Sequence, residues 1–186
     1  MPFTAVYDAC VLYPASLRDL LIRLAQTGLF RARWTNEILD ECFRNIAAKR
    51  PELKLEALER TRDLMNRAIR DVVVDGYQTL ISGLDLPDPD DRHVLAAAIR
   101  CGAEVIVTSN LRHFPADKLA RYELEAQHPD EFVLNLIDLD PVAVSSVVRE
   151  QAAALKNPPL SVLDVLASLE SAGLVQSVAR LRNQIH

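Results

Sequence analysis

The chain has 186 residues, of which 49% are hydrophobic and 25% charged, and its formal net charge at pH 7 is −5. This composition is typical of a globular protein with one sizeable core and excludes an intrinsically disordered chain. The negative net charge argues against a uniformly basic nucleic-acid-binding surface, although it leaves room for a local basic groove. No apolar run approaches the length of about 18 residues that a membrane span needs, and the N-terminus lacks a signal-peptide pattern. We therefore expect a cytoplasmic protein.

Alternating short apolar runs and amphipathic segments predict an alternation of strands and helices. In chain order, we expect a strand at 3–9, helices at 16–28, 35–49 and 53–69, a strand at 72–74, a short helical piece at 77–84, a helix at 89–101, a strand at 104–110 and a weaker strand at 131–136. From Pro141 onward the pattern is purely helical, with a break at 157–159. The prediction is an α/β fold with a parallel sheet covered on both faces.

Two of the predicted strands end on a polar side chain. Asp8 follows the first strand, and Asn110 ends the strand EVIVTSN. Because ligand sites in open parallel sheets form at the carboxyl ends of the strands, both residues should lie at the same edge. Each could instead be an ordinary turn or capping residue.

The segment LPDPDD, at 86–91, gathers three aspartates just before a predicted helix. Asp88 followed by Pro89 is typical of a helix N-cap with proline at the first helical position. Asp91 lies on the apolar stripe of the following helix, where a carboxylate is costly unless it is paired or binds a cation. Asp90 projects away from that stripe and is expected to face solvent.

The predicted helix at 35–49 supplies further carboxylates. Glu41 flanks its apolar stripe, Asp40 lies further toward solvent, and Glu37 stands one turn before Glu41, so the pattern alone hardly separates Glu37 from Glu41. Clustered carboxylates repel one another without a counter-charge, and oxygen ligands suit a hard divalent cation such as Mg²⁺ or Mn²⁺. Sites of this kind commonly serve phosphoryl chemistry.

Four segments occur in an order that resembles the PIN-domain family, and within it the VapC-type toxins of bacterial toxin–antitoxin pairs: AVYDACVL, TNEILDE, DPDDRHVLAAAIRCGAEVIVTSN and LRHFP. The resemblance covers roughly residues 3–138. It implies a three-layer PIN-like fold, a central parallel sheet flanked by helices, whose acidic residues bind Mg²⁺ or Mn²⁺ and cleave RNA. We therefore divide the chain into a PIN-like nuclease domain at 1–138 and a C-terminal helical extension at 139–186.

The resemblance also assigns roles to individual residues. Asp8, Glu41 and Asp91 match the first three acids of the family and are the expected metal ligands, whereas Asn110 stands where many members have a fourth aspartate. That neutral amide leaves a second metal in question, and Asp88 or Asp90 could make up the missing charge. The expected catalytic residues are Asp8, Glu41, Asp91 and Asn110, and the candidate RNA contacts are Arg44, Arg112 and His113.

The expected function is that of a metal-dependent endoribonuclease acting as the toxin of a type II toxin–antitoxin pair. The resemblance implies an RNA substrate, a cognate antitoxin protein and a homodimer, with no membrane partner. One alternative is a catalytically inactive PIN-like binding module, which Asn110 motivates. Another is a phosphatase of the haloacid-dehalogenase type, but its chemistry needs an aspartate two positions after Asp8, where this chain has Cys10.

Overall fold

The computed structural model describes residues 1–185 and is built around a four-stranded sheet. Its strands are β1 (Thr4–Tyr7), β2 (Arg31–Arg33), β3 (Val105–Val107) and β4 (Glu125–Gln127), in the spatial order β2-β1-β3-β4. All neighbouring strands run parallel, and Val6 lies level with Arg33 on one side and Ile106 on the other. The predicted parallel α/β class is confirmed.

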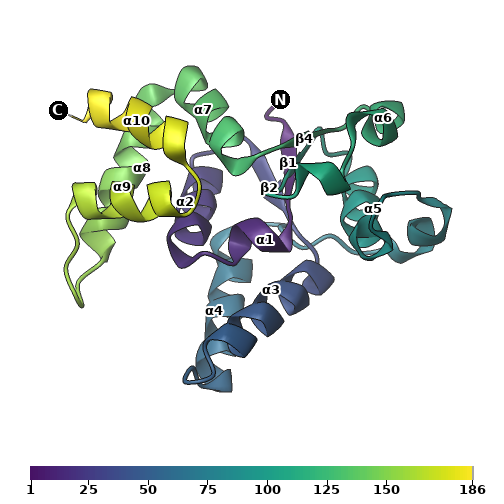
Figure 1. The fold of residues 1–186 in the computed structure, drawn as a ribbon, viewed down its shortest axis with the longest axis horizontal. Helices are drawn as coiled ribbons and strands as arrows, with labels where there is room; N and C mark the ends of the chain where they lie inside the picture. The colour runs from purple at the N-terminus through teal and green to yellow at the C-terminus, as the bar shows by residue number, and fades with distance from the viewer. Residues whose placement is uncertain (186) are drawn as a thin grey trace.

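Helices cover both faces of this sheet (Figure 1). The α-helices before the C-terminal extension are α1 (Ala9–Leu12), α2 (Ala15–Gln26), α3 (Asn36–Lys49), α4 (Leu55–Ala68), α5 (Arg92–Cys101), α6 (Ala116–Leu119) and α7 (Pro129–Leu139). Short 3-10 helices are η1 (Gln78–Gly83), η2 (Pro89–Asp91), η3 (Leu111–His113) and η4 (Ala120–Tyr122). Helices α2 and α7 lie on one side of the strands and α5 on the other, which gives the three layers that the resemblance implies.

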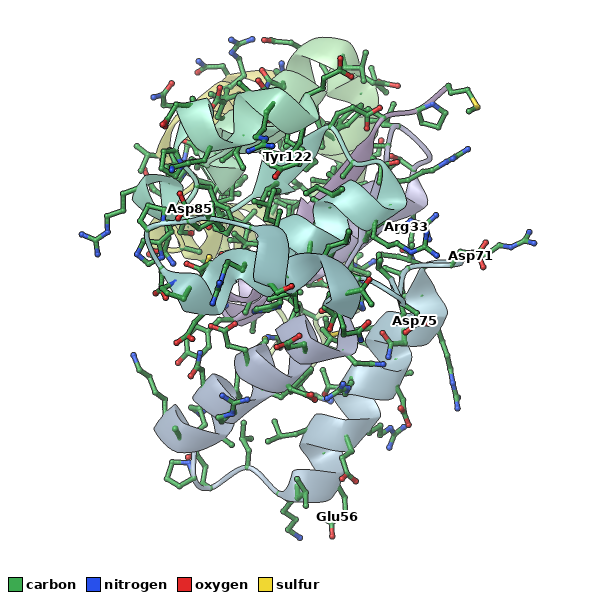
Figure 2. All side chains as sticks on the ribbon, turned by 90° about the vertical axis from the view of Figure 1, so that its right-hand side faces the viewer. Arg33, Glu56, Asp71, Asp75, Asp85 and Tyr122 are labelled. Carbon is green, nitrogen blue, oxygen red and sulfur yellow. The ribbon has the colours of Figure 1, made fainter. Side chains whose placement is uncertain are left out.

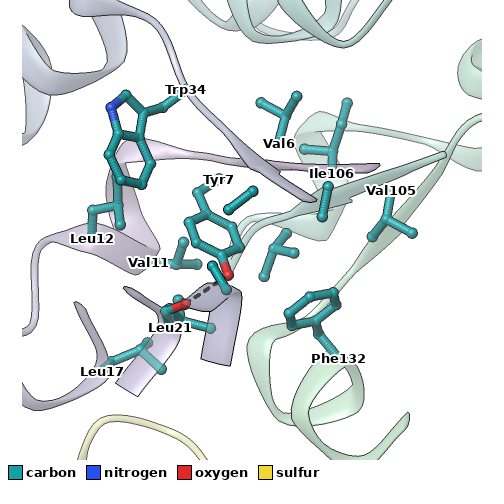
Figure 3. Close-up of a cluster of buried hydrophobic side chains, with 14 of the residues drawn as sticks. Val6, Tyr7, Val11, Leu12, Leu17, Leu21, Trp34, Val105, Ile106 and Phe132 are labelled. Carbon is teal, nitrogen blue, oxygen red and sulfur yellow. Dashed lines mark hydrogen bonds between the residues drawn. The ribbon is translucent and has the colours of Figure 1, made fainter. Parts of the chain in front are cut away.

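Aromatic side chains fill the core on the α2 and α7 side of the sheet. Tyr7 from β1 packs among Phe30, Trp34 and Phe132, and the rings of Phe30 and Phe132 meet edge to face with centroids 5.1 Å apart. Tyr7 is fully buried, so its hydroxyl needs a partner. It donates to the backbone oxygen of Leu21 in α2 at 3.0 Å (Figure 3). This core fixes β1, and with it the position of the residue that follows.

The strand predicted at 131–136 is wrong, because this segment belongs to α7. His128 caps the helix by accepting from the backbone nitrogen of Asp130 at 3.1 Å, and Pro129 takes the first helical position. The apolar residues at 132, 133, 136 and 137 follow a helical spacing and are buried. The fourth strand is instead the more polar β4, directly before α7.

The strand predicted at 72–74 is also wrong, although its residues do pair with the chain beyond β2. Trp34 donates its backbone N–H to Val72 O at 3.0 Å, and its oxygen accepts from Val74 N at 2.8 Å. This exchange forms an isolated parallel bridge centred on Val73 rather than a strand. The true edge strand is β2, which the sequence pattern did not indicate.

Helices α3 and α4 form a hairpin that extends away from the sheet, and Figure 2 shows Glu56 near its far end. Arg62 on α4 forms an ion pair with Asp40 on α3 and donates to the backbone oxygen of Asn36 at 3.1 Å. Asp40 therefore links the two helices of the hairpin while its side chain stays exposed, in agreement with its predicted position toward solvent.

The C-terminal helical extension is confirmed and consists of α8 (Pro141–Ala154), α9 (Val162–Ser171) and α10 (Val175–Gln184). Buried Asp130 on α7 accepts from the backbone nitrogens of Gln176 and Ser177, at 2.9 and 2.8 Å, and so holds the first turn of α10. Gln151 on α8 donates to Ser16 O at the start of α2 at 2.9 Å. Helix α7 thus connects the two parts of the chain, and the division at residue 138 stays a prediction. Within residues 1–185, no helix has both the length and the apolar character for a membrane span.

Candidate metal centre

Asp8 lies at the carboxyl end of β1, as predicted, and caps α1. Its Oδ1 accepts from the backbone nitrogen of Ala9 at 2.8 Å, and its Oδ2 accepts from the hydroxyl of Thr108 at 2.8 Å. The residue is only 4% exposed. The Cys10 thiol also lies 3.3 Å from Oδ2. Asp8 is therefore a capping residue, which was the alternative to a role in a site. It also has a fixed, buried position at the edge of the sheet where the site is expected.

Thr108, which the sequence analysis did not single out, connects the ends of β1 and β3. It is fully buried; its hydroxyl donates to Asp8 and accepts from the backbone nitrogen of Asn110 at 3.0 Å. The backbone nitrogen of Asp8 in turn donates to Val107 O at 3.1 Å. Asn110 thus follows the strand next to that of Asp8, at the predicted edge, and is exposed. The threonine that directly follows the VIV strand was the sequence signal for this contact.

The structure distinguishes Glu41 from Glu37, the two glutamates that the helical pattern hardly separated as candidate ligands. Glu37 Oε2 accepts from the hydroxyl of Tyr77 at 2.8 Å, so this carboxylate already has a hydrogen-bond donor as its partner. Glu41 lies one helical turn further along α3 and is close enough to Asp8 and Asp91 for their charges to raise its pKa. The structure therefore brings together Glu41, rather than Glu37, with the other two predicted ligands.

The three aspartates of LPDPDD take different positions. Asp88 caps η2 by accepting from the backbone nitrogen of Asp90 at 2.9 Å, and Pro89 follows at the first position, as predicted. Asp90 is exposed, also as predicted. Asp91 directly precedes α5, and its side chain is only 15% exposed. The functional candidate of this segment is thus the one that faces inward.

The electrostatics of Glu41 and Asp91 indicate a shortage of positive charge. Burial raises the pKa of Glu41, and the charges of Asp8 and Asp91 raise it further, while His93 and Arg44 oppose the shift. Burial likewise raises the pKa of Asp91, and Asp8 adds to that shift, while His113 opposes it. Glu41 and Asp91 thus come together with Asp8 from three different elements, and burial and nearby negative charge disfavour the ionised forms of Glu41 and Asp91, which a bound cation would reverse.

Asp91 also shows an unsatisfied buried oxygen. Within residues 1–185, its Oδ2 makes no well-directed hydrogen bond, although His113 Nδ1 lies 2.8 Å away. Ligand atoms of Asp88, Asp91 and His113 all lie within 4.8 Å of one another, so Asp91 belongs to a second possible metal group. A buried carboxylate oxygen whose close neighbour is a single histidine ring, in a set of carboxylates, fits an oxygen-preferring cation such as Mg²⁺ or Mn²⁺. The donor set therefore fits the predicted metal.

The candidate RNA contacts lie around this group. Arg44 on α3 is exposed, and its charge lowers the pKa of Glu41. Arg112 in η3 is exposed as well. His113, expected to contact phosphate, instead faces Asp91. The positions of these three residues do not test whether they contact RNA, so their assignment as RNA contacts stays a prediction.

Comparisons with known proteins agree with this arrangement. Residues 4–112 match the family described as PIN domain, and residues 129–183 match the family described as VapC50 C-terminal domain. A protein of Mycobacterium tuberculosis (strain ATCC 25618 / H37Rv) named "Putative ribonuclease VapC50" is 47% identical over 94 residues, which make up 49% of this chain and 55% of that relative. The chain thus aligns with only about half the length of this curated relative. No solved structure matches the chain with significance. Because the PIN-domain match spans more than half of the sequence, including Asp8, Glu41 and Asp91, the chain belongs to the PIN-domain family.

Proposed function

We propose that the protein is a metal-dependent endoribonuclease that hydrolyses RNA phosphodiester bonds and acts as the toxin of a type II toxin–antitoxin pair. The observation that carries this proposal is the convergence of Asp8, Glu41 and Asp91, from β1, α3 and the start of α5, in a chain of the PIN-domain family. The similarity to a relative named as a VapC ribonuclease supports the substrate class. RNA as substrate also implies a cytoplasmic location.

The proposed cation is Mg²⁺ or Mn²⁺, held by Asp8, Glu41 and Asp91. Such an ion supplies an acidified water and offsets the negative charge that develops on a phosphodiester during hydrolysis. The protein's own part is to fix the ligands: Thr108 and the N-terminus of α1 hold Asp8, and the start of α5 places Asp91. Asn110 would orient a ligand or water at the same edge without adding charge.

Positive side chains would place the RNA backbone near this centre. Arg44 and Arg112 are exposed on two elements that border the carboxylates, so each is available to a phosphate. His113 is more closely tied to Asp91, and we expect its contribution to RNA binding to be the smaller one. Because such contacts are electrostatic, RNA affinity should fall with rising salt concentration.

Cleavage of a labelled RNA tests the proposal. Protein stripped with EDTA should be inactive and should gain activity on addition of Mn²⁺. Asp91→Asn should lose activity by at least about 100-fold, whereas the matched control Asp90→Asn, an exposed neighbour, should cleave like the wild type. Equal activity of Asp91→Asn and the wild type would refute the proposal.

The principal alternative is a catalytically inactive PIN-like binding module, which Asn110 motivates. A wild type that binds RNA and Mn²⁺ but never cleaves would favour that function. Membership of the PIN-domain family argues against the phosphatase of the haloacid-dehalogenase type.

We also propose a protein antitoxin and a homodimer as partners. A small reading frame beside the gene, whose product copurifies with the protein and inhibits cleavage, would support the first. The molar mass of the isolated protein in solution tests the second.

A further inference from the structure

His93 is a buried histidine between α3 and α5, in the first turn of α5. It is 7% exposed and follows Asp91 by two residues. Its Nε2 lies 3.8 Å from Glu41 Oε2, and its Nδ1 lies 3.8 Å from Glu37 Oε2. The ring thus stands between Glu41, the carboxylate proposed to bind the cation, and Glu37, the one that accepts from the Tyr77 hydroxyl.

Neither nitrogen of His93 reaches a carboxylate closely enough for a hydrogen bond, since 3.8 Å exceeds the usual limit. Its Nδ1 is buried and has no hydrogen-bond partner among residues 1–185. A buried polar atom without a partner is unfavourable and calls for an explanation. A neutral imidazole carries a single N–H, so the proton placed on Nε2 would face Glu41, and a small movement of that carboxylate would complete a hydrogen bond to it.

The two neighbouring carboxylates differ in freedom. Glu37 is held by the hydroxyl of Tyr77, whose ring is buried against the start of α3. The side chain of Glu41 is 41% exposed and forms no hydrogen bond within residues 1–185 that would fix it. Glu37 thus has a fixed position on one side of the ring, and the Glu41 side chain is free to move on the other.

We propose that His93 is a positioning residue, which holds the Glu41 carboxylate toward Asp8 and Asp91 through its Nε2. Glu37, held by the hydroxyl of Tyr77, lies on the opposite side of the ring with its Oε2 3.8 Å from Nδ1. This inference rests on the proposed function, because it assigns His93 a task in the same metal centre. Groups that orient metal ligands in this way typically contribute a factor of about 10 to 100 to metal affinity.

Substitutions of His93 by different amides separate this role from simple packing. The side-chain nitrogen of Gln stands close to the place of Nε2, whereas that of Asn stands close to Nδ1. In titrations of the full chain with Mn²⁺ alone, His93→Ala and His93→Asn should weaken binding by roughly 10- to 100-fold, and His93→Gln should bind nearly as tightly as the wild type. RNA cleavage by the three variants should follow the same order.

Two further variants control for folding. His128→Ala removes a histidine that caps α7, so it should lower the melting temperature without changing Mn²⁺ affinity. Tyr77→Phe keeps the ring volume but removes the hydroxyl that holds Glu37, and it should weaken Mn²⁺ binding by less than His93→Ala does. If the His93 variants do not fold, the Tyr77→Phe variant decides between the two outcomes. An Mn²⁺ affinity of Tyr77→Phe equal to that of the wild type would then overturn the inference.

The outcomes also separate this inference from the proposed function. A wild type that binds Mn²⁺, together with folded His93→Ala that binds it equally well, would overturn the positioning role alone. Equal losses in His93→Gln and His93→Asn would show that only the shape of the ring matters and would overturn it as well. A wild type that neither binds Mn²⁺ nor cleaves RNA would overturn the proposed function, and the inference with it.

Discussion

Replacing Thr108 by Val tests the connection between the sheet and the candidate metal centre. The two side chains are nearly equal in volume, so the substitution removes the hydroxyl and leaves the packing in place. Thr108 is fully buried, and its hydroxyl donates to Asp8 Oδ2 at 2.8 Å and accepts from Asn110 N at 3.0 Å. The variant therefore loses one hydrogen bond to a carboxylate and one to a backbone amide.

The magnitude follows from these two contacts. A hydrogen bond to a charged group contributes about 1.5–3 kcal/mol and a neutral one about 1 kcal/mol, so Thr108→Val should lower the free energy of unfolding by roughly 3 kcal/mol. At about 2–4 °C per kcal/mol for a chain of this size, the melting temperature should fall by roughly 6–12 °C. Since Asp8 would also lose the group that orients it, Mn²⁺ affinity should fall by about 10- to 100-fold.

Thermal unfolding in EDTA and Mn²⁺ titration measure the two effects separately. Thr108→Ser keeps the hydroxyl and should retain most of the metal affinity. Thr61→Val is the matched control, because the Thr61 hydroxyl donates to Ala57 O within α4 and is exposed. A Thr108→Val variant with the stability and Mn²⁺ affinity of the wild type would refute the reasoning.

Three further predictions concern charge, the C-terminal extension and RNA. The pKa values of Glu41 and Asp91 are raised in the fold. When the pH lies below the ordinary pKa of a carboxyl group, near 4, the protonated side chains therefore stabilise the metal-free fold. This stabilisation is lost as the pH rises through the raised pKa values. Melting in EDTA should therefore show Glu41→Gln and Asp91→Asn more stable than the wild type at pH 7 and closer to it at pH 4; a wild type that is more stable than both at pH 7 would contradict this. Asp130→Ala removes two hydrogen bonds between a carboxylate and the first turn of α10, so it should lower the free energy of unfolding by about 3–6 kcal/mol and leave Mn²⁺ affinity unchanged; a melting temperature equal to that of the wild type would show that α10 is held by other contacts. In an Asp91→Asn background, Arg112→Ala should reduce the slope of log K against log salt for single-stranded RNA by about 0.7, and an unchanged slope would remove Arg112 from the RNA interface.

The parallel sheet and its central strands could be predicted from the sequence, because β1 and β3 are buried on both faces and read as continuous apolar runs. The edge strands could not. Strand β2 reads RAR, with Ala32 buried between two arginines that are more exposed, and β4 reads EAQ. An edge strand packs on fewer neighbours and tolerates charge, so it lacks the apolar signal that marks a central one.

The two wrong strands have a related cause. Short apolar runs do not by themselves distinguish a strand from a helix. The segment at 131–136 has the signals of a helix start just before it and within it: a capping residue, a proline at the first helical position and acidic residues in the first turn. The run at 72–74 is apolar and largely buried, but its backbone pairing within residues 1–185 is a bridge to Trp34, beyond the end of β2. Its extent as a strand depends on this pairing, which no local pattern contains.

For the candidate site, the pattern and the resemblance together indicated Asp8, Glu41 and Asp91, and the structure brings these three together. The choice of Glu41 over Glu37 could not be made from helical spacing, because it depends on Tyr77, forty positions away, which engages Glu37. His93 could not be recognised for the same reason, since its importance arises from contacts across two helices. Local pattern thus indicates which carboxylates are buried, and tertiary contacts decide which of them meet.

Anomalous diffraction from crystals of the protein grown with Mn²⁺ tests the central claim most directly. We predict a peak in the anomalous difference map that is contacted by carboxylate oxygens of Asp8, Glu41 and Asp91. A peak on the second possible group, Asp88, Asp91 and His113, with Asp8 and Glu41 uninvolved, would contradict the account, as would the lack of any peak under conditions in which the protein cleaves RNA.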